Sequence, residues 1–125
     1  MRALLIDPNK QAISEIDCGG TDDIRRVLGC KNHDLETSFS NGDRLYVDTD
    51  RFIGNFPPVA CFYLDADINP PTAGPIAGPA LVIGADGDAK INAAEMTARV
   101  LFVWCRYWSD MGGFGLYDSE ADARA

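Results

Sequence analysis

The residues best suited to catalysis in this sequence are a single histidine and a few thiols. His33 lies three residues after Cys30, and the other cysteines are Cys18, Cys61 and Cys105. A Cys–His pair can activate a thiol for nucleophilic attack, so an enzyme is one class of function to weigh. A solitary histidine that follows a short helix is more often a solvated loop residue, and we favour that interpretation for His33.

The residue types exclude several other catalytic sites. One histidine cannot supply a three-histidine zinc site or a two-histidine iron site within one chain. Neither a Cys-x-x-Cys pair nor a Gly-x-Ser-x-Gly motif occurs. Near pairs of carboxylates, such as Asp65 with Asp67, could hold magnesium but are more typical of solvated turns. We therefore expect reduced, mostly buried thiols, no catalytic residues and no cofactor.

One stretch has the spacing of the later part of an EF-hand calcium loop. Asp86 and Asp88 would take its third and fifth positions, and Asn92 and Glu95 its ninth and twelfth. Calcium prefers six to eight oxygen ligands, and this set could supply several of them. However, Gly84 stands where the first carboxylate belongs, and the apolar run before it is typical of a strand. We expect a strand-to-helix turn capped by Asn92, with calcium binding as the weaker alternative.

Aromatic residues form a second candidate binding set. Trp104, Tyr107 and Trp108 lie close together near the end of the chain, and Phe62 and Tyr63 lie in its middle. Aromatic rings can line a ligand pocket or anchor a protein interface. Packing inside the core would explain most of these residues equally well.

The charge balance favours some partners over others. Nineteen acidic against eleven basic residues give a net charge of -8. This argues against direct nucleic-acid binding, which depends on basic groups at the phosphates. An acidic surface can instead steer association with a basic protein surface, or it can simply keep a small domain soluble.

The first half of the chain has strong turn and cap signals. Residues 3–6 and 12–17 are predicted strands around a turn, and residues 21–29 a short helix. Thr21 is its expected N-cap, and Gly29 should end it in a left-handed conformation. Asn41-Gly42 then predicts a type I′ hairpin turn between strands 35–39 and 44–48. Farther on, the sequence predicts a strand at 59–64, a proline-rich loop or edge crossing at 70–79, and a strand at 80–83.

The final element is predicted to be a helix over about 92–108. Asn92 with Glu95 resembles a capping pair, and Met96, Val100 and Val103 share one helical face. Because every residue from 100 to 105 is apolar, a fully buried strand is the alternative there. Residues 118–125 are predicted to be a flexible tail.

Together these elements predict one α+β domain over residues 1–125. Its sheet should be small and mixed, mainly antiparallel, with about five to six strands, and should pack against the short helix and the C-terminal helix. A chain of this length can bury enough surface to fold alone. The sequence has neither a signal-peptide pattern nor an apolar run of about 20 residues, so we expect a cytoplasmic protein that does not enter membranes.

Several segments resemble a family of small phage- and plasmid-borne bacterial proteins of unknown function. They are residues 1–8, the helix end at 24–30, residues 41–48 and residues 76–84, so the resemblance covers about residues 1–90. It brings no catalytic residues. It implies a bacterial cytoplasm and an accessory role on mobile DNA. The aromatic segment after Asn92 lies outside it and is where we expect this chain's own binding function.

Three functional classes follow. The first, which we favour, is a non-enzymatic accessory protein that binds a host or phage protein, with counter-defence against a nucleic-acid-binding complex as its sharper form. The second is a protein that binds or sequesters a small nucleotide-like ligand. The third is an enzyme built on Cys30 and His33 or on aspartate pairs. A homo-oligomer is compatible with each of them.

Overall fold

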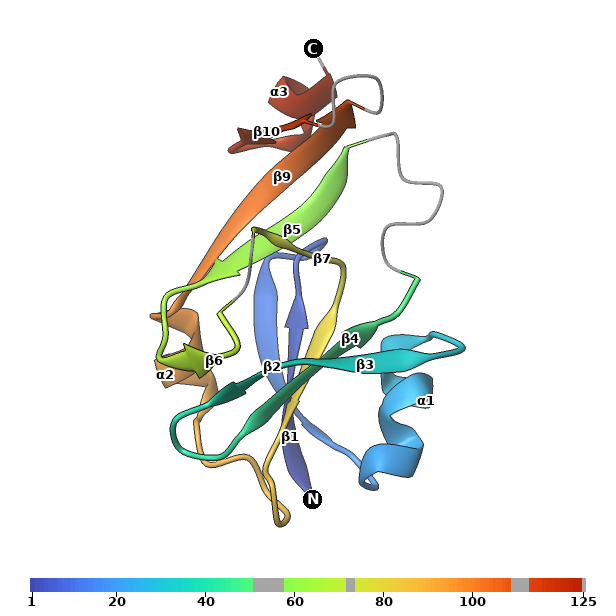
Figure 1. Cartoon of the computed structure of the whole chain (residues 1–125), viewed down its shortest axis with the longest axis vertical. Helices are drawn as coiled ribbons and strands as arrows, with labels where there is room; N and C mark the ends of the chain where they lie inside the picture. The colour runs from blue at the N-terminus through green and yellow to red at the C-terminus, as the bar shows by residue number, and fades with distance from the viewer. Residues whose placement is uncertain (51–57, 72–73, 109–112, 125) are drawn as a thin grey trace.

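The chain folds into two antiparallel sheets and a few short helices, which confirms the predicted α+β class. The computed structural model describes residues 1–50, 58–71, 74–108 and 113–124, with only the backbone described at residues 107, 108, 113 and 114. Within these ranges it has ten strands. Figure 1 shows the smaller sheet extending beyond the larger one along the long axis of the molecule.

The larger sheet has six strands in the order β2-β1-β8-β4-β3-β6, and every neighbouring pair is antiparallel. The short strand β6 therefore forms one edge, and β2 forms the other. The strands are β1 (Arg2–Asp7), β2 (Ala12–Asp17), β3 (His33–Phe39), β4 (Arg44–Asp48), β6 (Ile68–Asn69) and β8 (Ala80–Ile83).

The smaller sheet has four strands in the order β10-β9-β5-β7, again all antiparallel. Its long central strand β9 lies between β10 and β5, and Phe62 of β5 faces Phe102 of β9 directly. The strands are β5 (Val59–Leu64), β7 (Ile76–Ala77), β9 (Val100–Trp108) and β10 (Gly113–Tyr117).

The six-stranded sheet is covered on both faces, so its central strands are apolar on both sides. Helix α1 (Ile24–Leu28), which continues a 3₁₀ turn at Thr21–Asp23, packs on one face through Ile24 and Leu28. On the other face, Leu4 and Val82 join Phe62 of the smaller sheet and Met96 of helix α2 (Ala93–Thr97) in the main core. Burial of these side chains is the principal stabilising contribution.

The N-terminal hairpin and the end of the first helix confirm the sequence prediction. The carboxylate of Asp7 accepts a hydrogen bond from the amide of Asn9 at 3.0 Å within the predicted turn. Gly29 ends α1 with φ of 65°, in the left-handed region where an absent Cβ avoids a clash. The predicted cap was wrong, because Gly20 precedes the 3₁₀ turn and neither it nor Thr21 provides a side-chain cap.

The β3–β4 hairpin lies where it was predicted, but its turn is of another kind. Gly42 has φ of 95°, whereas Asn41 keeps a negative φ, so the turn is not type I′. Instead the Asn41 side chain accepts a hydrogen bond from the Asp43 amide at 2.8 Å, as in an Asx turn. This geometry directs the Asp43 side chain into the protein, where it is fully buried.

The predicted C-terminal helix was wrong beyond its first turn. Helix α2 ends at Thr97, and the apolar residues that follow form strand β9. The buried-strand alternative for residues 100–105 is therefore correct. The reason is non-local: residues 100–105 of β9 pair with the whole of β5, and this places Phe102 against the main core while Val103 joins Cys61 and Cys105 on the opposite face.

The presence of strand β9 in place of a long helix also changes the number of sheets and the structure at the end of the chain. The prediction of one sheet of five or six strands holds for the larger sheet, but β9 gives β5 a partner and creates a second sheet. Within the predicted tail at 118–125, helix α3 (Glu120–Arg124) contacts β9 and β10. Ala123 of this helix is buried, and its carbonyl accepts a hydrogen bond from Arg106 at 3.3 Å.

Candidate functional site

Three hollows adjoin one another on the side of the molecule that carries α2 and β6 (left in Figure 1). We call them together the groove. The apolar hollow, of about 380 Å³, is lined by Tyr63, Leu64, Asp65, Ala98, Arg99, Val100 and Leu101. The polar pocket, of about 240 Å³, is lined by Phe39, Ser40, Asn41, Ala66, Asp67, Ile91, Glu95 and Arg99. The edge hollow, of about 460 Å³, is lined by Ser38, Phe39, Ser40, Asp67, Ile68 and Asn69.

The three hollows share lining residues and are therefore neighbours. Arg99 lines both the apolar hollow and the polar pocket. Phe39, Ser40 and Asp67 line both the polar pocket and the edge hollow. The groove, taken as these three neighbouring hollows, extends from the paired ends of β5 and β9, past α2, to the β6 edge of the larger sheet.

The groove carries an excess of negative charge. Asp65, Asp67 and Glu95 are exposed, and their carboxylates take part in no hydrogen bond or ion pair within the described part of the chain. Arg99 is the cation among the lining residues, and its guanidinium donates to the carbonyl of Asp65 at 3.4 Å. Lys90 lies nearby but outside the lining, where its ammonium donates to the carbonyl of Asn41 at 2.8 Å.

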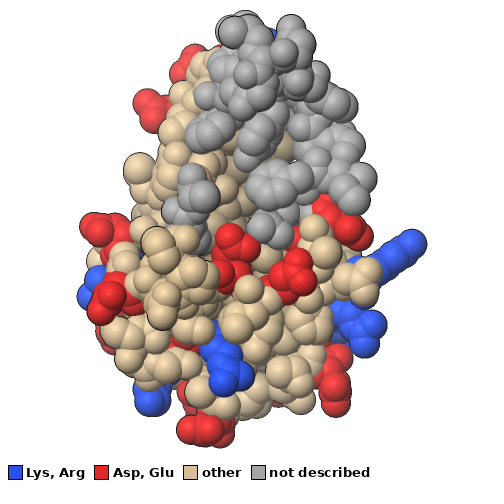
Figure 2. All heavy atoms as spheres, viewed as in Figure 1, with Lys and Arg blue, Asp and Glu red and all other residues tan. Residues whose placement is uncertain are grey.

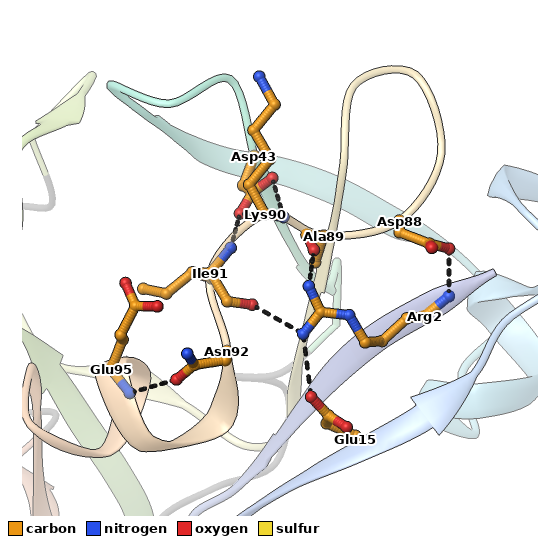
Figure 3. A network of polar contacts seen from close by, with 9 residues as sticks. All are labelled: Arg2, Glu15, Asp43, Asp88, Ala89, Lys90, Ile91, Asn92 and Glu95. Carbon is orange, nitrogen blue, oxygen red and sulfur yellow. Dashed lines mark hydrogen bonds and ion pairs between the residues drawn. The ribbon is translucent and has the colours of Figure 1, made fainter.

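The floor of the polar pocket is fixed by a buried carboxylate (Figure 3). Asp43 accepts hydrogen bonds from the amides of Lys90 and Ile91, with Oδ2 at 3.0 and 2.9 Å respectively. A further bond to Oδ2 comes from the Asn41 side chain at 3.2 Å. Because a buried carboxylate is stable only when its oxygens are satisfied, these bonds tie the β3–β4 hairpin to the segment before α2.

Arg2 holds the same segment from the side of β1 (Figure 3). Its guanidinium donates to the carbonyl of Ala89 and to the Glu15 carboxylate, the latter at 2.9 Å. The backbone of Arg2 adds two bonds, because its amide donates to Asp88 at 2.7 Å and its carbonyl accepts from the Ala89 amide at 2.8 Å. The loop that positions Ile91 and Glu95 in the groove is thus anchored to two strands.

The residues of the EF-hand-like pattern have structural roles. The side chain of Asn92 accepts a hydrogen bond from the Glu95 amide at 2.8 Å, which confirms the predicted helix cap. Asp88 is bound to Arg2, and Asp86 lies exposed in the loop. Among the residues with described positions, no three His, Cys, Asp or Glu side chains are grouped so that they could hold a metal ion. The calcium alternative therefore has no assembled ligand set to support it.

The five aromatic candidates have different environments. Phe62 is fully buried in the main core, and Trp104 is partly buried on β9 opposite Ala60. Tyr63 is half-buried and lines the apolar hollow. The side chains of Tyr107 and Trp108 lie outside the described residues. Of the described aromatic candidates, Tyr63 is thus the one that the structure brings into the groove.

Sequence reasoning missed Leu101, which is 62% exposed, and its neighbour Arg99. On the helix that was predicted over about 92–108, Leu101 would only have widened the apolar face. In a strand, alternation puts Leu101 on the same face as the buried Val103, at the end where that face becomes exposed. The signal was present in the sequence, but it could be interpreted only once the segment was known to be a strand.

Two of the thiols lack the lowered pKa of a nucleophilic cysteine. Burial, and to a lesser extent the charge of Asp48, raises the pKa of Cys30. Burial, with a smaller contribution from neighbouring Cys105, raises the pKa of Cys61 to about 12. His33 lies edge-on to Tyr46, with 5.7 Å between ring centroids, and its buried Nδ1 has no hydrogen-bond partner among the described residues.

Comparison with known proteins identifies no relative of this chain. No protein-family model, curated protein or solved structure matches the chain. Separately, none of the helices in the described ranges is long and apolar enough to cross a membrane.

Proposed function

We propose that this protein is a non-enzymatic interaction protein that binds another protein through the groove. The observation that carries the proposal is the exposed Leu101 beside Tyr63 at one end of the groove, whose other walls bear carboxylates that have no partner within the described part of the chain. An exposed large apolar side chain next to a half-buried aromatic ring is typical of an interface anchor. The surrounding polar walls correspond to the rim that gives such an interface its specificity.

The state of the reactive groups supports a non-enzymatic role. Two thiols, Cys30 and Cys61, have a pKa that departs clearly from the ordinary value. Burial raises the pKa of both. Neither lines the groove. Catalytic sites usually combine a cleft with groups whose pKa values are tuned toward reactivity. Here the two thiols lie away from the groove, and burial raises the pKa of Tyr63, which lines it.

The biological setting of the proposal is an accessory role on a phage or plasmid in the bacterial cytoplasm. It is supported by the resemblance of residues 1–90 to small phage- and plasmid-borne proteins. Antagonism of a nucleic-acid-binding defence complex is its sharper form and is supported by the net charge of -8. On the face in Figure 2, acidic side chains are scattered among Lys and Arg over the described surface rather than gathered in one patch. A local acidic groove therefore supports protein binding better than mimicry of a whole nucleic-acid backbone does.

A nucleotide-like ligand is the weaker alternative. The polar pocket alone holds about 240 Å³, below the range of roughly 300–1,000 Å³ that is usual for small-molecule sites, whereas the two adjoining hollows fall within that range. Charge is therefore the main argument against such a ligand in the polar pocket, because its acidic residues Asp67 and Glu95 would repel phosphate groups. A thermal-shift screen with nucleotides tests this alternative, since a ligand that binds only the folded state raises the melting temperature.

Site-specific photocrosslinking tests the proposed function. Tyr63 is replaced by the photoreactive residue p-benzoylphenylalanine, and the labelled protein is irradiated in a lysate of the bacterium that carries the gene. Leu35, which is 51% exposed on β3, is the matched control position. We expect a discrete protein adduct from position 63 and none from position 35. Equal labelling from both positions, or no adduct at position 63, would contradict the proposal.

A further inference from the structure

We infer that the occupant of the groove is an extended partner segment in which basic residues lie next to an apolar residue. This inference rests on the proposed function and specifies the chemistry of the partner. It follows from the order of the three hollows, in which an apolar end lies next to an acidic middle across Arg99. A compact ligand would fill one hollow, whereas an extended segment can contact all three.

The apolar end can receive one large aliphatic or aromatic side chain. Leu101 and Tyr63 are directly opposed in the β5–β9 register, so their side chains lie on the same face of the smaller sheet. Leu101 is 62% exposed, and the adjoining Val100 and Leu64 are partly buried. An apolar side chain placed here would remove the exposed surface of Leu101 from water, which is the favourable term in such binding.

The middle of the groove favours a cation. Asp67 comes from the β5–β6 connection and Glu95 from α2, so the two carboxylates approach the polar pocket from different elements. Neither carboxylate has a partner within the described part of the chain. Arg99 already binds a backbone carbonyl through its guanidinium, and Lys90 likewise binds the carbonyl of Asn41. A lysine or arginine of the partner would therefore meet two carboxylates that no cation in the described part of this chain holds.

The walls of the groove are organised before binding. The Asp43 carboxylate fixes the backbone of Ile91, and the Asn92 side chain fixes the start of the helix that bears Glu95. The amide of Ser40 donates to the carbonyl of Asp67 at 3.1 Å and joins the two walls of the polar pocket. A groove with fixed walls loses little conformational entropy on binding, so even a short segment can bind selectively.

Charge also disfavours acidic peptides, nucleic acids and a second copy of this chain as occupants of the groove. The excess of carboxylates in the groove repels acidic peptides and nucleic-acid phosphates. A second copy of this chain carries the same net charge of -8, which opposes self-association through an acidic groove. The basic and apolar segment of a different protein is the occupant that matches both halves of the groove.

Selection from a random dodecapeptide phage-display library on the immobilised full chain tests this inference. We expect enriched peptides to combine Lys or Arg with a neighbouring Leu, Phe or Trp. The strongest peptide is then synthesised with a fluorescent label, and its binding is measured by fluorescence polarisation. For the double variant Asp67→Asn/Glu95→Gln, we expect binding to be about fivefold weaker at low salt, with a smaller difference at high salt.

A second variant tests the apolar end. Leu101→Ser should weaken binding of the same peptide about tenfold, whereas Leu35→Ser, at a similarly exposed position on β3, should not change it. Enrichment of acidic or uncharged peptides, no enrichment, or unchanged binding by both groove variants would overturn the inference. Because the crosslinking experiment does not depend on the chemistry of the partner, an adduct from position 63 would leave the proposed function standing in each of these cases.

Discussion

The carboxylate of Asp43 accepts a hydrogen bond from the amide of Ile91 at 2.9 Å, although 48 positions of sequence separate the two residues. Asp43 is fully buried and Ile91 is 5% exposed, so water cannot replace this bond. The contact connects the turn of one hairpin to the segment that begins α2. It therefore determines where the floor and one wall of the groove lie.

Removing the Asp43 carboxylate should destabilise the fold. Asp43→Ala leaves the buried Ile91 amide and the partly buried Lys90 amide without acceptors, and we expect a loss of about 3 kcal/mol in the free energy of unfolding. Asp43→Asn keeps one acceptor oxygen and should lose about 1 kcal/mol. Urea denaturation measures both values. The exposed Asp34→Ala is the control, and an equally large loss there would contradict the explanation.

Gly84 is required by a close approach between backbone segments. A Cβ at this position would collide with the carbonyl oxygen of Asp88, which is itself fixed within the loop. Gly84→Ala should therefore cost about 2 kcal/mol or more of unfolding free energy, by the mechanism of overpacking. In contrast, a Cβ at Gly19 would meet the Asp23 side chain at an ordinary distance of 3.5 Å. Thermal unfolding should show a lowered melting temperature for Gly84→Ala and little change for Gly19→Ala.

The Asp23–Arg26 pair should make stability depend on pH in the acid range. The hydrogen bond from Arg26, helped by the amide of Gly19, lowers the pKa of Asp23 from 3.8 to about 2. The folded state thus holds this proton less tightly than the unfolded state. The contribution of the pair is complete above about pH 4 and disappears as the pH falls through about 2.

The variant Asp23→Asn tests this dependence. It should be less stable than the natural chain at pH 7, and the difference should shrink as the pH falls from about 4 through about 2; chemical denaturation at each pH measures it. Asp22→Asn removes the neighbouring exposed carboxylate and is the control for the loss of one negative charge at this turn. A difference that persists unchanged at pH 2 would refute the role of the ion pair.

The thiols should differ in their reactivity. Cys18, Cys61 and Cys105 are buried, whereas Cys30 is partly exposed but has a raised pKa. At pH 7.5 we expect Ellman's reagent to modify Cys30 alone, and slowly, in the folded protein, and all four thiols after unfolding in urea. The variant Cys30→Ser should abolish the reaction of the folded state. Rapid modification of Cys30 would point instead to an activated thiol and would reopen the possibility of an enzyme.

Local signals in the sequence located the short elements well. Gly29 ends the first helix and Asn92 caps the second because each effect depends on residues within one turn. The strands at 12–17, 44–48, 59–64 and 80–83 were likewise bounded by turn residues and have the predicted limits. The predicted N-cap at Thr21 was wrong although its residue type was suitable, because Thr21 is already the first residue of the 3₁₀ turn and Gly20 takes the cap position.

Strand β9 could not be distinguished from a helix by local sequence signals. An apolar run such as residues 100–105 fits either a buried helix or a strand that is covered on both faces, and no residue within it breaks a helix. The structure resolved the ambiguity through β5, which offers a complete set of backbone partners from Val59 to Leu64. Such pairing depends on a segment about 40 residues away and cannot be read from the run itself.

The fold class, the positions of most turns and the excess of acidic residues could be predicted from the amino-acid sequence, as could the absence of common metal and hydrolase motifs. Each of these depends on composition or on residues close together in the chain. The position of Asp67, Glu95 and Leu101 along one groove could not be predicted in this way, because three separate segments must pack together before those side chains share a surface. The same packing turned Asp43 from an ordinary turn residue into the buried acceptor that positions the groove floor.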